Sequence, residues 1–358
     1  MYYAFAAIVL LVYTLILIYI VGKFKRSHSL KKLKEFNKKI YYLVIFMFIL
    51  LLLLFAVIDA INAFVIYIHF FIFSLLFDLL FLIFRKKLKF NLPIILAILT
   101  TFIYLGIGYY NAYHIRKTIY NLDTNKNIEN FKIALISDAH IGTTFNGEGF
   151  TKEIEKIIIE KPDLFVIIGD FVDDDSKKED MIKACSIFKN IETKYGIYFV
   201  FGNHDKGYFS NRDFNEEDLR KELTKNGVII LEDLSVSLGD NITLIGRQDK
   251  QVINRKNIKE LVSNLDGDNY VIVLDHQPND YEQEADTFVD LVLSGHTHGG
   301  QLFPLGIIGT SFGSNDSTYG LIKKNDTNFI VSSGISDWTI KFKTGTFSEY
   351  VIINVNHK

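Results

Sequence analysis

The chain has 358 residues, enough for two domains, and its formal net charge of −2 conceals two halves of opposite charge. Residues 1–120 hold 14 Lys and Arg against 3 Asp and Glu, whereas residues 121–358 hold 25 against 38. The acidic second half disfavours a nucleic-acid partner. The single cysteine, Cys185, excludes an intrachain disulfide and any cysteine-based zinc cluster.

Four apolar segments in the first 110 residues are long enough to cross a bilayer as helices: residues 2–21, 40–58, 63–84 and 92–110. No basic residue precedes the first segment and no small-residue cleavage site ends it, so we expect a retained helix rather than a cleaved signal peptide. His69 and Asp78 fall within the third segment. An ionisable group at that depth is a functional candidate, but a contact with a neighbouring helix or an interface is the simpler interpretation, and neither residue is assigned a role.

Two basic segments separate these spans. Residues 23–39 carry eight Lys and Arg against Glu35 alone, and Arg85, Lys86, Lys87 and Lys89 follow the third span. Because basic loops stay in the cytoplasm, this pattern places the N-terminus and everything after residue 110 on the other side. We therefore expect a multi-pass protein of the cell membrane, with residues 1–112 as a four-helix transmembrane domain and an extracytoplasmic second domain.

Residues 113–130 are polar and are expected to form a linker to a domain over residues 131–358. Short apolar runs alternate there with amphipathic segments, which is typical of an α/β or layered sandwich domain. Strands are predicted at residues 131–136, 164–168, 198–201, 242–245, 270–274, 291–293, 329–331 and 350–353. Helices are predicted at residues 151–160 and 176–194, and Cys185 falls with Met181, Ala184 and Phe188 on the core face of the second.

Several predicted strands end in residues that bind metals. They are Asp138 and His140 after the first, Asp170 after the second, Asn203, His204 and Asp205 after the third, His276 after the fifth, and His296 and His298 after the sixth. Taken singly, each has an ordinary explanation: a helix cap, a turn, or a side chain that satisfies local backbone groups. Together, imidazoles with carboxylates and an amide fit Mn²⁺, Fe²⁺ or Zn²⁺. They are too many for one tetrahedral ion, so two divalent metal ions are the better fit.

In their order, Asp-x-His, Gly-Asp, Gly-Asn-His-Asp, a lone His and Gly-His-x-His are similar to the five signature blocks of the calcineurin-like metallophosphoesterases. The ending Gly295-His296-Thr297-His298-Gly299-Gly300-Gln301 resembles the bacterial membrane-associated branch of that superfamily. The resemblance covers roughly residues 130–355. It implies an α/β metallophosphoesterase domain, a four-layer α/β/β/α sandwich, which would follow the α helical membrane domain that the four apolar segments predict.

The resemblance also implies a role for each residue. One metal would be held by Asp138, His140, Asp170 and His298, and the second by Asp170, Asn203, His276 and His296, with Asp170 bridging the two. His204 would act as general acid or charge stabiliser, oriented by Asp205. The extra carboxylates Asp173, Asp174 and Asp175 are expected to form a solvated turn rather than to serve as ligands.

Two divalent ions about 3.5 to 4 Å apart would lower the pKa of a shared water and hold the attacking and leaving oxygens in line. The leading hypothesis is therefore a membrane-anchored phosphoesterase acting on the phosphodiester or diphosphate bond of a lipid-linked substrate. A soluble nucleotide-type phosphodiester is the enzymatic alternative, and a non-catalytic receptor or assembly module stabilised by metals is the other. Leu302, Phe303, Leu305, Ile307 and Ile308 form a candidate hydrophobic lip beside the site, with a packed strand or turn as the equal alternative.

Overall fold

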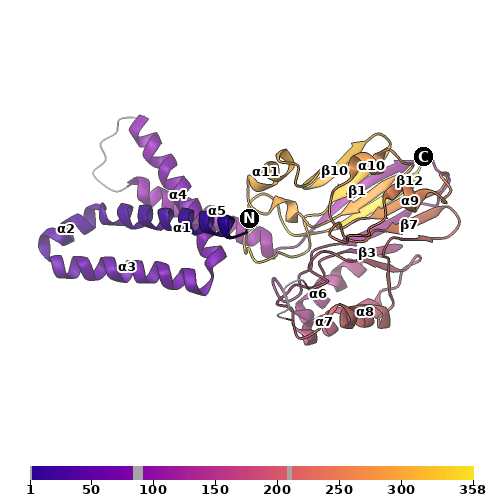
Figure 1. Cartoon of the computed structure of the whole chain (residues 1–358), viewed down its shortest axis with the longest axis horizontal. Coiled ribbons are helices and arrows are strands. Elements are labelled where there is room, and N and C mark those ends of the chain that lie inside the picture. Colours follow the sequence, from indigo (N-terminus) through magenta and orange to yellow (C-terminus); the bar gives the residue numbers. More distant parts are fainter. Residues whose placement is uncertain (1, 84–91, 208–211) are drawn as a thin grey trace. The chain divides into compact units, whose positions relative to one another are not determined.

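The computed structural model describes residues 2–83, 92–207 and 212–358, and the chain divides into two compact units, residues 1–107 and 108–358 (Figure 1). The basic residues Arg85, Lys86, Lys87 and Lys89 lie outside the described residues. Each unit is described below by itself.

The first unit is helical. It contains α1 (Tyr2–Lys25), α2 (His28–Phe36), α3 (Lys38–Ile58), α4 (Ala60–Ile83) and most of α5 (Leu92–Tyr113). All but α2 are long and apolar enough to cross a membrane, and at most 22% of the residues in each candidate span are buried. Apolar side chains that stay exposed along a whole helix are what a lipid environment requires. The four predicted apolar segments are thus confirmed as helices.

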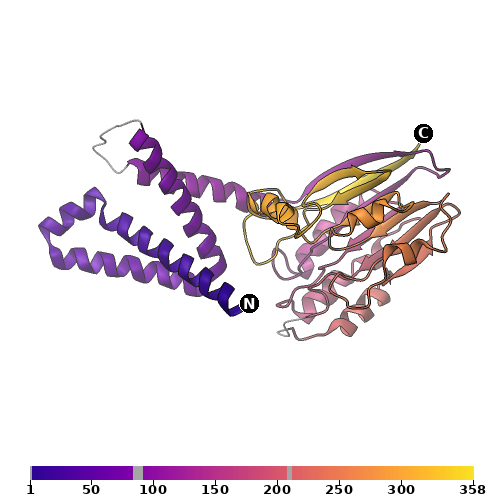
Figure 2. The same cartoon turned by 45° about the horizontal axis from the view of Figure 1, so that its top comes forward.

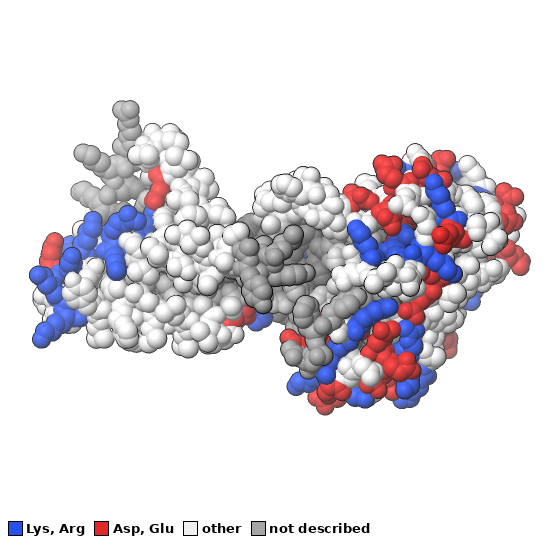
Figure 3. Space-filling view, in the orientation of Figure 1, with Lys and Arg blue, Asp and Glu red and all other residues white. Residues whose placement is uncertain are grey.

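The basic segment between the first two spans is not a plain loop, since it contains α2. Ser27 caps this helix by accepting a hydrogen bond from the backbone N–H of Leu30, and Leu30 is buried. In Figure 3 the blue Lys and Arg of the first unit gather around the region that Figure 1 labels α2, and most of its other described surface in this view is white.

The ionisable residues of the third span face neighbouring helices. Asp78 of α4 forms an ion pair with Lys23 of α1. His69 Nδ1 lies 2.7 Å from the backbone oxygen of Val65 in its own helix, and its ring centroid is 5.4 Å from that of Tyr104 on α5. Each side chain therefore has a structural partner, in agreement with the simpler interpretation.

The second unit is built on two six-stranded sheets. In the first sheet the order is β1 (Arg116–Thr124), β12 (Glu349–His357), β2 (Phe131–Ile136), β3 (Leu164–Ile168), β4 (Ile197–Val200) and β5 (Val228–Ile230). In the second it is β10 (Gly320–Lys324), β11 (Thr327–Val331), β9 (Leu291–Ser294), β8 (Tyr270–Leu274), β7 (Ile242–Gly246) and β6 (Leu234–Ser237). Neighbouring strands run parallel except in the pairs β12–β2, β10–β11 and β6–β7.

Helices cover the outer face of each sheet. The helices α6 (Gly147–Ile158), α7 (Lys178–Cys185) and α8 (Glu216–Lys225) pack on the first sheet, and α9 (Ile258–Val262) and α10 (Tyr281–Ala285) on the second (Figures 1 and 2). Along β2, Ile133 and Leu135 point into the core between the sheets, while Ala134 and Ile136 point toward the helices. Burial on both faces explains why the central strands are continuous apolar runs. The four-layer α/β/β/α sandwich is confirmed.

Two sequence predictions about the fold need correction, and several elements were not predicted. The expected linker, residues 113–130, contains β1, which pairs in parallel with all nine residues of β12. It is an edge strand with largely exposed, polar side chains, so it lacks the apolar run by which the other strands were found. The predicted helix 176–194 ends at Cys185 and is followed only by the short helix η1 (Phe188–Asn190). The edge strands β5, β6 and β10 and the helices α8, α9, α10 and α11 (Leu305–Ser311) were not predicted.

Candidate metal centre

The predicted site residues all follow the carboxyl ends of parallel strands. Asp138 follows β2, Asp170 follows β3, Asn203 follows β4, His276 follows β8 and His296 follows β9. Parallel strands bring their carboxyl ends to one edge of a sheet, where α/β proteins build their ligand sites. The structure brings the two sheet edges together at these residues, because His276 of the second sheet contacts Asp170 of the first.

Unusual backbone angles mark these turns. Asp138, His140, Asp170, His296 and His298 have φ values of 53°, 38°, 50°, 70° and 48°, a left-handed region that non-glycine residues rarely adopt. Such conformations cluster at functional sites, where the surrounding structure imposes them. Here the turn after β2 is hydrogen-bonded to the turn after β3. The backbone N–H of Asp138 donates to Gly169 O and that of His140 donates to Asp170 O, both at 3.0 Å.

The first group of candidate ligands is Asp138, His140 and His298, whose nearest donor atoms all lie within 4.8 Å of one another. His298 Nδ1 lies 3.3 Å from the backbone oxygen of Ser336, which leaves Nε2 facing Asp138 Oδ1 at 3.8 Å. Nε2 of the buried His140 makes no hydrogen bond among the described residues. Buried nitrogens without a hydrogen bond are costly, and a metal ion would satisfy them.

The second group is Asp170, His276 and His296. His276 Nδ1 lies 2.8 Å from the backbone oxygen of Ile168, so this nitrogen carries the ring proton. In the neutral ring Nε2 then presents its lone pair to Asp170 Oδ2 at 3.1 Å. Two electron-pair donors this close repel one another unless a proton or a cation lies between them, so the pair fits a metal ion.

Asp170 connects the two groups. Its Oδ2 lies 3.1 Å from His276 Nε2 and 3.9 Å from His140 Nε2, while Oδ1 accepts a hydrogen bond of 2.8 Å from the backbone N–H of His204. The free oxygen therefore faces one histidine of each group. This is the geometry expected of a carboxylate shared by two ions.

Asn203 also fits the predicted ligand set. Its Oδ1 is buried and has no hydrogen-bond partner among the described residues. An amide oxygen is a hard ligand that suits divalent cations. The neighbouring Gly202 packs so closely on Asp170 that a Cβ there would lie 2.2 Å from Asp170 Oδ1.

Asp173 is a site residue that the sequence reasoning missed. It is buried, and its carboxylate oxygens lie 3.0 Å from His204 Nδ1 and 3.4 Å from His140 Nδ1. Asp174 is 3.6 Å from the same nitrogen of His204. The expected solvated turn is therefore wrong for Asp173, because the bridge between Ile141 and Val172 draws this segment back over the site. The run of acidic residues after Asp170 was the available signal.

The prediction that Asp205 orients His204 is also wrong. Both oxygens of Asp205 accept hydrogen bonds from backbone N–H groups: those of Asp170, Phe171 and Gly202 at 2.8 Å and that of Val172 at 3.1 Å. Asp205 thus fixes the turn that carries Asp170, and Asp173 takes the position beside the His204 ring.

Lys343 is a further residue that the sequence did not single out. Its side chain is fully buried, and Nζ donates to the backbone oxygens of Ser333 at 2.7 Å and Ser336 at 3.0 Å. The same Ser336 oxygen is the one that faces His298 Nδ1. Lys343 therefore holds the loop against which a candidate ligand is oriented.

The pKa values of the four candidate histidine ligands are shifted by burial and by neighbouring charges. Burial, and then the neighbouring imidazoles, lower the pKa of His296 to about 4 and hold the pKa of His298 well below its usual value, so both are neutral at pH 7. The neutral ring is the form that binds metals. Burial alone would lower the pKa of His276 and His140, but the carboxylates of Asp170 and Asp173 raise it instead. A cation binding there would displace protons.

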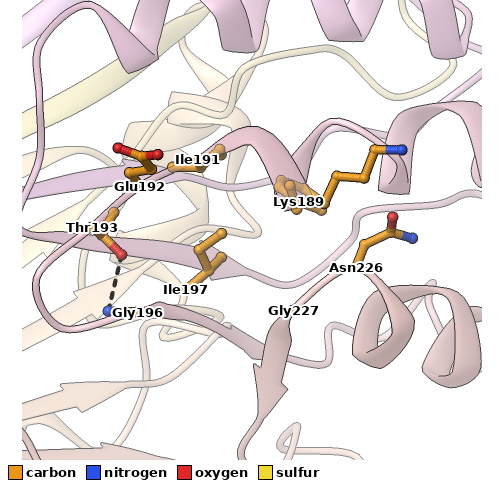
Figure 4. A pocket seen from close by; sticks show the side chains of 9 residues that line it. Lys189, Ile191, Glu192, Thr193, Gly196, Ile197, Asn226 and Gly227 are labelled. Atoms are coloured by element: carbon orange, nitrogen blue, oxygen red, sulfur yellow. Dashed lines mark hydrogen bonds between the residues drawn. The ribbon is translucent and has the colours of Figure 1, made fainter.

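A separate cavity of about 340 Å³ lies at the amino end of β4, opposite the end that carries Asn203 (Figure 4). Its lining includes Lys189, Glu192, Thr193 and Asn226, and Thr193 Oγ1 accepts a hydrogen bond of 2.9 Å from the backbone N–H of Gly196. None of the lining residues is a histidine or an aspartate, so this cavity is distinct from the candidate metal centre.

Known proteins share this domain. Residues 131–300 match the family model of the calcineurin-like phosphoesterases. An uncharacterized metallophosphoesterase from Aquifex aeolicus is 32% identical over 216 residues, 57% of this chain and 79% of that protein. The uncharacterized metallophosphoesterase Cj0846 from Campylobacter jejuni is 29% identical over 235 residues, 64% of this chain and 60% of that protein.

A transmembrane protein with metallophosphoesterase domain from Bos taurus is 26% identical over 291 residues, 74% of this chain and 62% of that protein. The match thus spans about three fifths of the Campylobacter and Bos taurus proteins. With two sheets in four layers and metal-binding residues at their facing edges, the chain belongs to the calcineurin-like metallophosphoesterases.

Proposed function

We propose that this protein is a membrane-anchored phosphoesterase that uses two divalent metal ions, Mn²⁺, Fe²⁺ or Zn²⁺, to hydrolyse a phosphodiester or diphosphate bond. The observation that carries the proposal is the position of Asp170, whose free oxygen faces a histidine of each ligand group. A site built to bind one structural ion has no need of a carboxylate shared between two histidine clusters.

The residues divide between two ions. Asp138, His140 and His298 would hold the first, His276, His296 and Asn203 the second, and Asp170 both. When bound, the ions neutralise the phosphate oxygens and lower the pKa of a water so that it attacks at neutral pH. The chain contributes the fixed positions of these side chains, because the turns that carry them hydrogen-bond to one another.

His204 is proposed as the group that assists the leaving oxygen. Its side chain is 19% exposed, and Asp173 accepts the Nδ1 proton at 3.0 Å. Burial alone would lower the pKa of His204, but the carboxylates of Asp173 and Asp170 raise it to about 9. Asp173 therefore favours the protonated ring. A protonated imidazole can donate its other proton to the departing alkoxide or stabilise charge on the phosphate.

The substrate is proposed to be lipid-linked, and the catalytic domain to lie outside the cytoplasm. Four helices long and apolar enough to span a membrane precede the domain, and the basic segments between them favour a cytoplasmic position for those loops. Partners would then be membrane lipids and a phosphorylated small-molecule or lipid-linked substrate, with no nucleic acid. The Bos taurus relative, a transmembrane protein with metallophosphoesterase domain, supports the combination of anchor and domain.

Turnover and metal content of the purified full chain test the enzymatic proposal together. We expect hydrolysis of an aryl phosphodiester with Mn²⁺, its loss on chelation and about two metal ions per chain. Full metal occupancy without turnover on aryl or lipid-linked phosphoesters would instead favour the non-catalytic module. Equal turnover on soluble nucleotides and on lipid extracts would contradict the preference for lipid.

Cysteine labelling tests the orientation. Cys185 is buried, so a cysteine placed at Lys358 is the accessible one. We expect an impermeant maleimide to label it from outside intact cells. Labelling only after lysis would reverse the proposed topology.

A further inference from the structure

A stretch of uncharged residues lies on the surface directly after the ligand His298. Residues 299–314 contain no charged side chain, although the domain around them is rich in Asp, Glu, Lys and Arg. In Figure 3 the region that Figure 1 labels α11 is white, whereas charged residues crowd the rest of the visible domain surface.

Helix α11 buries none of its residues. Phe303 before the helix is 59% exposed, Ile307 within it 61% and Phe312 after it 84%, and Leu305 and Ile308 are exposed as well. We call these five residues the α11 surface. Apolar side chains concentrated in this way on a charged domain mark a surface that is covered in the working protein.

The α11 surface is joined to the end of a candidate membrane span. Phe303 N–H donates to Thr344 Oγ1 at 3.0 Å, and Thr344 N–H donates to Gln301 O at 2.9 Å. The preceding residue, Lys343, donates its N–H to Gly108 O in α5 at 2.9 Å. Two short steps of hydrogen bonding therefore link the α11 surface to the last turns of α5.

Those last turns carry an aromatic cluster typical of a membrane interface. Tyr109, Tyr110 and Tyr113 are all exposed, and the ring of Tyr109 lies 6.5 Å from that of Phe342 in the same connecting loop. Tyrosines concentrate at the level of the lipid headgroups, because one end of the ring is apolar and the other is polar. Residues 108–113, the end of α5 within the second unit, thus carry the side chains expected at a bilayer surface.

A cavity of about 490 Å³ opens beside the same helix. It is lined by Gly299 and Gly300, which directly follow His298, and by apolar residues that include Leu302, Phe303 and Ile307. The α11 surface and this cavity therefore share Phe303 and Ile307, and Asp316 is the one charged residue in the lining.

We propose that the α11 surface inserts among the acyl chains of the bilayer that α5 spans, and that it thereby holds the phosphoesterase site at the level of the lipid headgroups. The proposal rests on the proposed membrane anchor. The occupant is the lipid bilayer itself, since the surface is uncharged, lies next to interfacial tyrosines and is tied to the helix that leaves the membrane.

Lipid quenching of tryptophan fluorescence tests this contact. Trp338 is the only tryptophan, so Trp338→Phe gives a silent background for Phe312→Trp in the full chain. In vesicles of brominated phosphatidylcholine, we expect the fluorescence of Trp at position 312 to fall at least twofold relative to unbrominated vesicles. The control is Asp240→Trp, in the exposed turn before β7, at the opposite end of the sheet. Equal quenching at both positions, or none at 312, would overturn the proposal.

Activity separates this inference from the proposed function. Phe312→Asp, at a position outside that cavity, should lower turnover of a phospholipid diester in vesicles about tenfold and leave turnover of a soluble aryl phosphodiester unchanged. Ile159→Asp, at an isoleucine that is 76% exposed after α6, should alter neither. An equal loss on both substrates would contradict membrane contact. A wild-type protein inactive on both would refute the proposed function, while the quenching measurement would still decide the contact.

A second copy of the chain is the competing occupant. A cysteine at position 312 that forms disulfide-linked dimers in vesicles, without quenching by brominated lipid, would assign the α11 surface to self-association and overturn the proposal.

Discussion

Asp173 Oδ1 lies 3.0 Å from His204 Nδ1, and both side chains lie at the edge of the candidate metal centre. Asp173→Asn should reduce kcat by about 10² to 10⁴ at neutral pH, the range that a positioned acid contributes. Because Asp173 helps to raise the pKa of His204, the amide should also move the alkaline limb of the pH–rate profile to lower pH. Asp175→Asn, at a neighbouring exposed carboxylate, is the matched control. An unshifted profile would show that Asp173 does not act through His204.

Asp205→Ala should destabilise the domain more than the loss of one hydrogen bond. Four buried backbone N–H groups would lose their acceptor, and each unsatisfied donor costs roughly 1–3 kcal/mol before relaxation. We expect a lower melting temperature and weaker metal retention. Asp213→Ala removes an exposed carboxylate that accepts one backbone N–H, that of Lys178, and should change either quantity far less. Similar melting temperatures for the two variants would contradict this role of Asp205.

Gly202→Ala tests the close packing around Asp170. The added Cβ would lie 2.2 Å from Asp170 Oδ1, so the carboxylate or the turn must move, at a cost of about 1–3 kcal/mol. We expect fewer bound metal ions per chain, measured by elemental analysis. Gly309→Ala in α11, where nothing lies within 4 Å of the new Cβ, should retain the full metal content. Unchanged metal content in Gly202→Ala would argue against Asp170 as a ligand.

Glu349→Gln tests the pH dependence of stability at a buried carboxyl that is not a candidate metal ligand. Burial raises the pKa of Glu349 above 4.5, although Ser333 N–H and Tyr319 OH each donate to it at 3.0 Å. The folded protein then binds a proton that the unfolded chain has released, so the free energy of unfolding falls as pH rises from about 4.5 through the raised value.

Melting temperatures of the full chain in detergent between pH 4.5 and pH 8 measure this slope. The uncharged glutamine should flatten it, whereas Glu217→Gln, at an exposed surface position, should not. If both variants changed the slope equally, Glu349 would not be its source.

The sequence by itself determined the parts of this protein that depend on local composition. Four apolar runs require helices of membrane length, and continuous apolar runs such as residues 164–168 form strands buried on both faces. The ligand candidates were also readable, because Asp170, His276 and the others each follow directly on such a strand, and parallel strands collect their ends.

Only the tertiary structure decided which groups each carboxylate of the site contacts. Asp205 adjoins His204 in sequence, yet its carboxylate accepts hydrogen bonds from backbone N–H groups of another turn. The carboxylate that contacts the His204 imidazole is that of Asp173, about thirty residues earlier. Likewise β1 has too few apolar side chains to be recognised alone, since an edge strand is stabilised mainly by backbone hydrogen bonds to its partner. Hydrogen bonds between distant segments depend on how the folded chain orients the donor and the acceptor. The local sequence around each group does not specify that orientation.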